Sequence, residues 1–282
     1  MSQALPAAAH RVTIAGSTSA WSAFDLRPLW QRRDLLRLLA LRDIRVRYKQ
    51  AALGAGWAIL QPVITMVVLH LFFGRLLDLE DRVGGAPYPV FLFAGLLPWT
   101  LFASSIIASS NALVANSGIL KKAAFPRMLI PVSAMGAPLL DFAIASVVLV
   151  GMMVVFQTPL TWQLLLLPAI GATVLLAVFG VGLILSAATA AYRDVRHIAP
   201  FLVQVGLFLT PVIYPISIVP ERFHTLLMLN PMHGAVLAFR GAILGTPIDY
   251  TAWACSVGIG LAAAVVGLWQ FHRVERRFAD VI

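Results

Sequence analysis

"RDIRVRYKQAALGAGWAILQPVITMVVLHLFFG", residues 42–74, joins a dense basic cluster directly to a long uncharged stretch. Four basic residues stand at positions 42, 45, 47 and 49, and no charged side chain follows until Arg75. A soluble domain seldom needs such a boundary, whereas a membrane surface does. A helix crosses the hydrocarbon with about 20 mostly apolar residues. We therefore interpret this stretch as an interface segment that leads into a membrane crossing.

The composition of the whole chain also indicates a membrane protein. Of 282 residues, 60% are hydrophobic and 12% are charged, whereas soluble proteins have about 25% charged residues. Long uncharged runs cover 50–74, 83–120, 142–192, 197–220 and 250–272. Because a backbone in lipid must satisfy its own hydrogen bonds, each crossing is expected to be a helix. The sequence predicts an all-α integral membrane protein.

Six crossings are predicted from the apolar runs and their Pro and Gly boundaries. They cover 52–74, 88–114, 129–156, 162–190, 198–214 and 250–271. The stretch 215–249 is apolar but interrupted by Pro and Gly, so we expect short re-entrant helices between the fifth and sixth crossings. The predicted domains are a disordered tail (1–24), an amphipathic interface helix (25–50), the transmembrane domain (51–272) and a C-terminal tail (273–282).

The positions of Lys and Arg predict the orientation. If both termini are cytoplasmic, all but four of the 21 basic residues fall on the inside; the exceptions are Arg75, Arg82, Arg222 and Arg240. The net charge of +9 therefore comes from basic residues at the predicted edges of the membrane, and we expect no nucleic-acid partner. On the helix 25–50, Arg42, Arg45 and Lys49 should face water, while Leu41, Ile44 and Tyr48 face lipid.

The sequence lacks the motifs of common active sites. It has no GxxxxGK[ST] phosphate loop, no CxxC and no HExxH, and its six histidines lack metal-ligand spacing. We expect no metal site and no cofactor in this chain, which leaves a pore, a carrier or a permease. Asp141 is the clear acid within a crossing. It either hydrogen-bonds within the bundle or takes part in transport.

Three stretches resemble a known family. They are LALRDIRVRYKQAALGAGWAILQP (39–62), NSGILKKAAFPRMLIPVS (116–133) and YRDVRHIAPFLVQVGLFLTPVIYPISIVPERFHTLLMLNPM (192–232). In that order they are similar to the permease subunit of ABC exporters that move O-antigen, capsular polysaccharide or teichoic acid. Ala51 stands where that family more usually has Ser or Thr.

The resemblance implies a half-transporter in the bacterial inner membrane, with both termini cytoplasmic. A second copy of the chain and two separate ATPase subunits would complete it, and ATP and Mg would bind to those subunits. The cargo would be a polysaccharide on a polyprenyl diphosphate lipid, moved from the cytoplasmic side across the membrane. Membrane lipid would be a further partner. Rival functions are a drug or small-lipid permease, an ion-coupled carrier and a membrane glycosyltransferase. The scarcity of acidic pairs weighs against the last.

The resemblance also implies a coupling loop near 116–130 that contacts the ATPase. Pro126 should end a short helix there, while basic and apolar side chains meet the partner. The competing interpretation is an ordinary positively charged inside loop. The predicted coupling residues are Ser117, Ile119, Leu120, Lys121, Lys122, Phe125, Pro126 and Arg127.

Two further sites follow from the cargo that the resemblance implies. Arg42, Arg45, Arg47 and Lys49 would receive the lipid diphosphate, because Arg suits phosphate; the alternative is a membrane anchor. Trp57, Phe208 and Tyr214 would line a glycan conduit, because sugar rings stack on aromatic faces. The alternative for such aromatics is the belt at the membrane interface.

The last predicted site is an outer gate. The stretch 215–245 should dip back into the membrane, with turns at TPVIYP and LNPM. Arg240 would then snorkel to the headgroups or find a partner. The predicted gate residues are Pro211, Pro215, Asn230 and Pro231.

Overall fold

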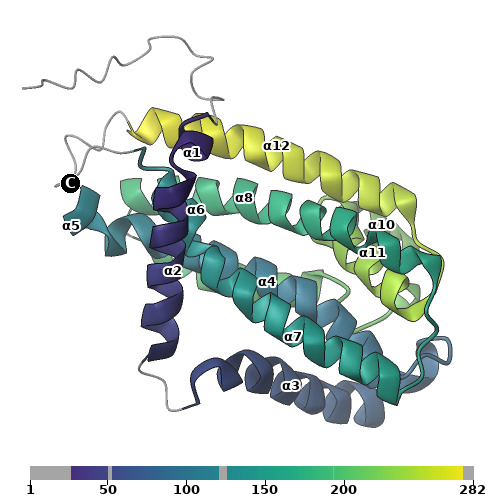
Figure 1. Cartoon of the computed structure of the whole chain (residues 1–282). Coiled ribbons are helices and arrows are strands. Elements are labelled where there is room, and N and C mark those ends of the chain that lie inside the picture. The colour runs from purple at the N-terminus through teal and green to yellow at the C-terminus, as the bar shows by residue number, and fades with distance from the viewer. Residues whose placement is uncertain (1–26, 50–52, 121–125, 193, 276–282) are drawn as a thin grey trace, which may run out of the picture.

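A computed structural model describes residues 27–49, 53–120, 126–192 and 194–275, and these residues contain helices and no strand. The described part of the chain begins with α1 (Arg27–Gln31) and α2 (Arg33–Lys49), and continues with α3 (Trp57–Leu69), α4 (Tyr88–Ala115) and α5 (Ser117–Leu120). The later helices are α6 (Leu129–Ala134), α7 (Gly136–Val155), α8 (Leu167–Ala191), α9 (Val195–Leu209), α10 (His224–Met228), α11 (His233–Leu244) and α12 (Tyr250–Glu275). In Figure 1, α2 runs across one end of a bundle formed by the long helices.

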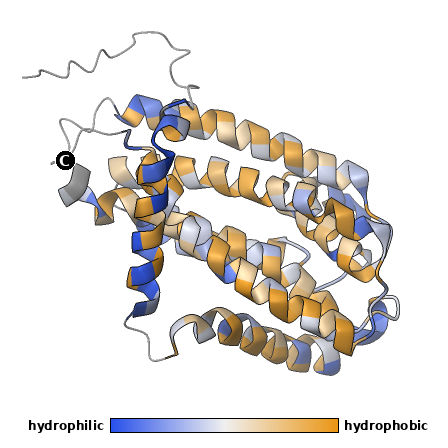
Figure 2. Ribbon diagram, in the orientation of Figure 1, coloured by the Kyte–Doolittle hydropathy of each residue, from blue (hydrophilic) through white to orange (hydrophobic). Residues whose placement is uncertain are grey.

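Five helical segments are long and apolar enough to cross a membrane. They are Gly54–Leu76, Tyr88–Ala115, Leu129–Val155, Trp162–Ala191 and Tyr250–Glu275. A bent pair, Glu221–Met228 with His233–Leu244, makes a sixth if it counts as one span. Figure 2 shows these segments as largely hydrophobic, with hydrophilic residues gathered on α1 and α2. The predicted integral membrane fold and five of the predicted crossings are confirmed.

The predicted crossing at 198–214 differs most from the structure. Helix α9 has 15 residues and ends at Leu209, because Thr210 adopts an extended conformation (φ −103°, ψ 134°). At 1.5 Å per residue, α9 is about 22 Å long, which is less than the 30 Å hydrocarbon core. The chain continues from Thr210 to Ile213 in non-helical conformation, buried inside the protein.

The bundle is built around α4. Twenty of its 28 residues are buried, including Tyr88, Phe93 and Leu97. A helix that is apolar on all sides belongs in the middle of a membrane bundle, and α4 packs against α3, α7, α8, α9 and α11. Beside it, α8 and α12 approach closely through small residues: a Cβ added to Gly180 would lie 2.5 Å from the backbone nitrogen of Ala264. Small residues at such contacts let membrane helices pack backbone to backbone.

Arg240 on α11 is buried, with 5% of its surface exposed. Its Nε donates a hydrogen bond to the carbonyl of Phe91 (3.2 Å) and its Nη2 donates one to the carbonyl of Val212 (2.7 Å). The guanidinium also lies 3.7 Å from the centre of the Phe91 ring. Arg240 therefore finds partners inside the protein, and the alternative that it snorkels to headgroups is wrong.

Gly95 makes room for this arginine. A Cβ at Gly95 would overlap the Arg240 guanidinium and would lie 2.9 Å from the Val212 carbonyl oxygen. Gly95→Ala should therefore displace Arg240 and leave buried carbonyls unpaired, costing roughly 1–3 kcal/mol. We expect a lower melting temperature in detergent. The control is Gly258→Ala, because a Cβ there meets nothing within 4 Å. Equal melting temperatures for the two variants would contradict this role of Gly95.

Candidate functional site

A groove of about 320 Å³ lies where α2 meets α3, α4, α7 and α9. Its lining combines polar and aromatic side chains with apolar ones such as Leu96 and Val203. The lining includes Arg47, Tyr48, Trp57, Gln61, Thr65, Trp99, Thr100, Ser104 and Asp141. We call this the polar groove. Its side chains offer hydrogen-bond donors and acceptors beside two indole rings.

An ion pair forms part of the wall of the polar groove. Arg47 Nη2 lies 2.9 Å from Asp141 Oδ2, and the Tyr48 hydroxyl donates a hydrogen bond to Asp141 Oδ1. Burial, followed by the hydrogen bond and charge of Asp141, raises the pKa of Tyr48 to about 12. Tyr48 therefore keeps its proton at neutral pH and remains a donor. Of the two roles predicted for Asp141, the structure shows hydrogen bonding within the protein.

This pair fastens α2 to the membrane span that contains Asp141. Asp141→Asn should lower the free energy that attaches α2 to this span by about 1 kcal/mol or less, because Arg47 is 44% exposed and solvent screens the ion pair. Amide hydrogen exchange near the end of α2 should become a few times faster. Asp34→Asn is the matched control, since Asp34 is on α2, is 84% exposed and approaches Arg37 only to 4.0 Å. Unchanged exchange in Asp141→Asn would show that the pair does not hold α2.

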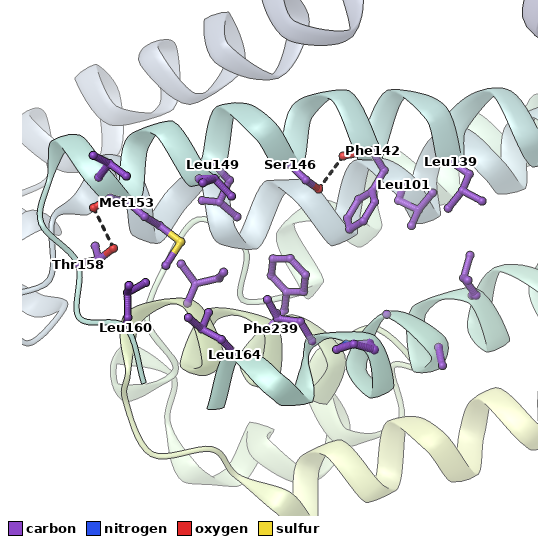
Figure 3. A pocket seen from close by; sticks show the side chains of 18 of the residues that line it. Leu101, Leu139, Phe142, Ser146, Leu149, Met153, Thr158, Leu160, Leu164 and Phe239 are labelled. Carbon is purple, nitrogen blue, oxygen red and sulfur yellow. Dashed lines mark hydrogen bonds between the residues drawn. The ribbon is translucent and has the colours of Figure 1, made fainter. Parts of the chain in front are cut away.

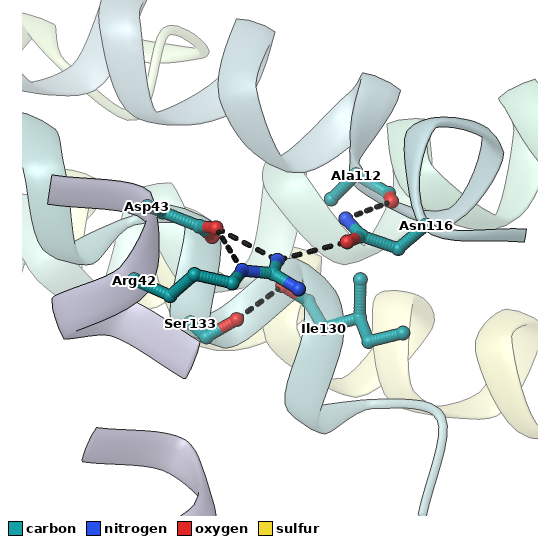
Figure 4. Close-up of polar contacts among 6 residues, drawn as sticks. All are labelled: Arg42, Asp43, Ala112, Asn116, Ile130 and Ser133. Atoms are coloured by element: carbon teal, nitrogen blue, oxygen red, sulfur yellow. Dashed lines mark hydrogen bonds and ion pairs between the residues drawn. The ribbon is translucent and has the colours of Figure 1, made fainter. Parts of the chain in front are cut away.

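The four cations predicted for the lipid diphosphate do not gather in one place. Only Arg47 lines the polar groove. Arg45 and Lys49 are exposed. Arg42 was predicted to face water, but its guanidinium turns toward protein: Nη2 lies 2.7 Å from Asp43 Oδ1 and 2.8 Å from Asn116 Oδ1 (Figure 4). The prediction for Arg42 was wrong because amphipathic periodicity does not reveal a polar partner on α4.

Of the residues predicted for a glycan conduit, Trp57 lines the polar groove and is half exposed. Phe208 and Tyr214 are not among the lining residues; they contact each other through a 2.9 Å hydrogen bond from the Tyr214 hydroxyl to the Phe208 carbonyl. Sequence reasoning missed Gln61 and Thr65 as groove residues. A signal did exist, because Trp57, Gln61 and Thr65 are spaced at i, i+4 and i+8 and so share one helix face.

The residues predicted for an outer gate lie around the non-helical stretch after α9. Pro211 and Pro215 are buried. Asn230 Nδ2 donates to Thr210 Oγ1 (2.7 Å), and its Oδ1 accepts from the backbone of Met232 (2.9 Å), beside Pro231. Two helical segments, Glu221–Met228 and His233–Leu244, meet at a bend of 103° over residues 229–232. This bend is consistent with the predicted re-entrant helices, and a gating role stays a prediction.

The predicted coupling loop is partly described. Ser117 begins α5, which contains Ile119 and Leu120, whereas Lys121, Lys122 and Phe125 lie outside the described residues. After Pro126, the Arg127 backbone N–H donates to Glu275 Oε1 (3.3 Å) and its Nη1 donates to the Glu275 carbonyl (3.2 Å). The end of the loop is therefore attached to the C-terminal end of α12.

A second, larger cavity of about 980 Å³ lies between α7, α8 and α11 (Figure 3). It contains no charged residue, and leucine, valine and phenylalanine side chains such as Leu149, Leu164 and Phe239 dominate its wall. Such a wall suits hydrocarbon, and its polar side chains are limited to Ser146, Gln157 and Thr158. Within the described ranges, no group of three or more His, Cys, Asp or Glu side chains is placed to hold a metal ion.

Comparison with known proteins decides the family. The sequence model of the ABC-2 type transporter family matches residues 34–244, which include α2, the polar groove and the bent pair. The chain belongs to the ABC-2 type transporter family. It is thus a transporter permease with multiple apolar membrane helices.

Relatives within this family carry more specific names. The chain is 31% identical over 250 residues to the O-antigen export system permease protein RfbA of Klebsiella pneumoniae, covering 88% of this chain and 95% of the relative. It is 32% identical over 218 residues to RfbA of Myxococcus xanthus, covering 76% and 82%. It is 27% identical over 234 residues to the polysialic acid transport protein KpsM of Escherichia coli, covering 76% and 85%.

Proposed function

We propose that this ABC-2 permease exports a lipid-linked polysaccharide, O-antigen-like in kind, across the bacterial inner membrane. The observation that carries the proposal is the polar groove, in which Trp57 and Trp99 stand beside Gln61, Thr65 and Thr100. Aromatic faces stack on the C–H faces of sugars, while amides and hydroxyls pair with sugar hydroxyls. The names of the relatives as O-antigen and polysialic acid transporters support the same class of cargo.

The headgroup would approach where α2 meets the groove. Arg45 and Lys49 are exposed on α2, and Arg47 lines the groove. Arginine binds phosphate with charge-assisted hydrogen bonds, so these three residues are the proposed contacts for a polyprenyl diphosphate. Phe208 and Tyr214 would continue the aromatic path further along. The buried turns at Pro211, Pro215 and Asn230–Pro231 would close its far end.

The proposed machine contains two copies of this chain and two separate ATPase subunits, which bind ATP and Mg. The chain itself would have no catalytic role, and both termini would be cytoplasmic. The first described residues of α1 and the end of α12 lie at the same end of the bundle (Figure 1). That arrangement supports placing both termini on one side. The described end of the predicted coupling loop lies there too, because Arg127 contacts Glu275.

One rival function has an observation in its favour. The cavity between α7 and α8 is apolar enough to admit a drug or a small lipid. An apolar cargo would depend on that cavity, whereas a polysaccharide would depend on the polar groove. An ion-coupled carrier gains little support from Asp141, because this carboxylate is already paired with Arg47 at 2.9 Å.

Trp57→Ala tests the polar groove as the path of the glycan. Losing one stacking face should reduce the rate of polysaccharide export roughly fivefold, the effect of about 1 kcal/mol. Trp162→Ala is the control, because Trp162 is 64% exposed and does not line the groove. Export is measured by the appearance of glycan on the far side of vesicles containing the reconstituted transporter. Equal rates for both variants would exclude the groove as the glycan path.

Charge reversal in the coupling loop tests the ATPase contact. Changing Lys121 and Lys122 together to Glu should repel an acidic groove on the partner and uncouple hydrolysis from export. The variant should still insert into the membrane. Copurification of the ATPase and export per ATP hydrolysed are the two measurements. Normal export by the variant would show that this loop is not the contact.

A further inference from the structure

Arg42 joins the interface helix α2 to the end of the central helix α4. Its Nη2 donates a 2.8 Å hydrogen bond to Asn116 Oδ1 across 74 residues of sequence. Asp43 holds the guanidinium from the other side, accepting from Nε (3.0 Å) and from Nη2 (2.7 Å) (Figure 4). The arginine is therefore fixed in direction, and charge-assisted bonds of this kind are about twice as strong as neutral ones.

Asn116 is itself fixed to α4. Its Nδ2 donates to the carbonyl of Ala112 (2.9 Å), and its backbone N–H donates to the same carbonyl (3.1 Å). The next residue, Ser117, begins α5, the described start of the proposed coupling loop. The amide of Asn116 thus stands between that loop and the interface helix.

Helix α2 has no buried residue of its own. It rests on α6 and α7, where Ala40 approaches so closely that a Cβ on Gly136 would lie 2.9 Å from the Ala40 Cβ. Further along, Arg47 and Tyr48 bind Asp141 and line the polar groove. A displacement of α2 therefore moves a wall of that groove.

We propose that the Arg42–Asn116 bond transmits movement of the coupling loop to α2, and so opens or closes the polar groove in step with ATP hydrolysis. Arg42 and Asn116 are positioning residues in this scheme and need not touch the cargo. The inference rests on the proposed function, because it takes the loop to be the place where the ATPase acts.

Two substitutions of Asn116 separate this link from a local effect on α4. Asn116→Asp keeps an acceptor oxygen for Arg42, whereas Asn116→Leu has nearly the same size and no acceptor. Both lose the side-chain donor to Ala112, and the added charge of Asp is unfavourable at a helix C-terminus. If Asn116→Asp exports better than Asn116→Leu, the difference is therefore due to the contact with Arg42.

The expected result is a loss confined to Asn116→Leu. With the ATPase subunits bound and hydrolysing ATP normally, export per ATP should fall about tenfold in Asn116→Leu, the worth of one charged hydrogen bond. It should stay within about twofold of wild type in Asn116→Asp. Arg37→Ala, which removes a charge from an exposed site on the same helix, is the control and should export normally. Equal losses in both Asn116 variants, or normal export in both, would overturn the proposal.

A second measurement follows the movement itself. Val46 is 70% exposed on α2, so Val46→Cys in a Cys255→Ala background provides a labelling site. Its labelling rate should change when ATP is added to the assembled transporter, and this response should disappear in Asn116→Leu and persist in Asn116→Asp. A response that survives in Asn116→Leu overturns the link while leaving the proposed function intact. Failure of wild-type hydrolysis to drive export overturns the proposed function and the link with it.

Discussion

Arg240 satisfies backbone carbonyls that would otherwise be stranded within the bundle. In a membrane protein every buried carbonyl needs a partner, because hydrocarbon offers none. Helix α9 ends at Leu209, and the carbonyls of Val212 and Ile213 lie in a buried, non-helical stretch. Arg240 donates to the first, and the Tyr88 hydroxyl donates to the second at 2.9 Å. Burying a charge is costly, and here two carbonyl dipoles and the Phe91 ring offset that cost.

This contact joins two helices, α11 and α4, and the non-helical stretch after α9. Arg240 comes from α11, its carbonyl partner Phe91 from α4, and the space it occupies exists because residue 95 on α4 is glycine. One guanidinium thus links α11, which follows the bend, to the chain that continues from the short α9. A broken span beside a short helix is tolerated because its irregular backbone is buried in protein.

The apolar spans were predictable to within a few residues because hydrocarbon imposes one length and one composition. Prediction was poorer where backbone carbonyls act as partners. Pro211 and Pro215 predicted a turn here, but the apolar residues around them did not show that α9 ends at Leu209, too short for a full crossing. The partners of Arg240 are main-chain atoms, which have no sequence signature. The spacing of Trp57, Gln61 and Thr65 indicates one face of the polar groove. Only the folded structure shows that Asp141 lies in the same groove.

The charges of α2 explain why this helix differs from the rest of the structure. Arg42 and Arg47 bind acceptors on α4 and α7, while Arg45 and Lys49 remain exposed. Half-exposed ion pairs are worth at most about 1 kcal/mol each, whereas the central helix α4 is held by twenty buried residues. Detaching α2 therefore costs far less than shifting α4.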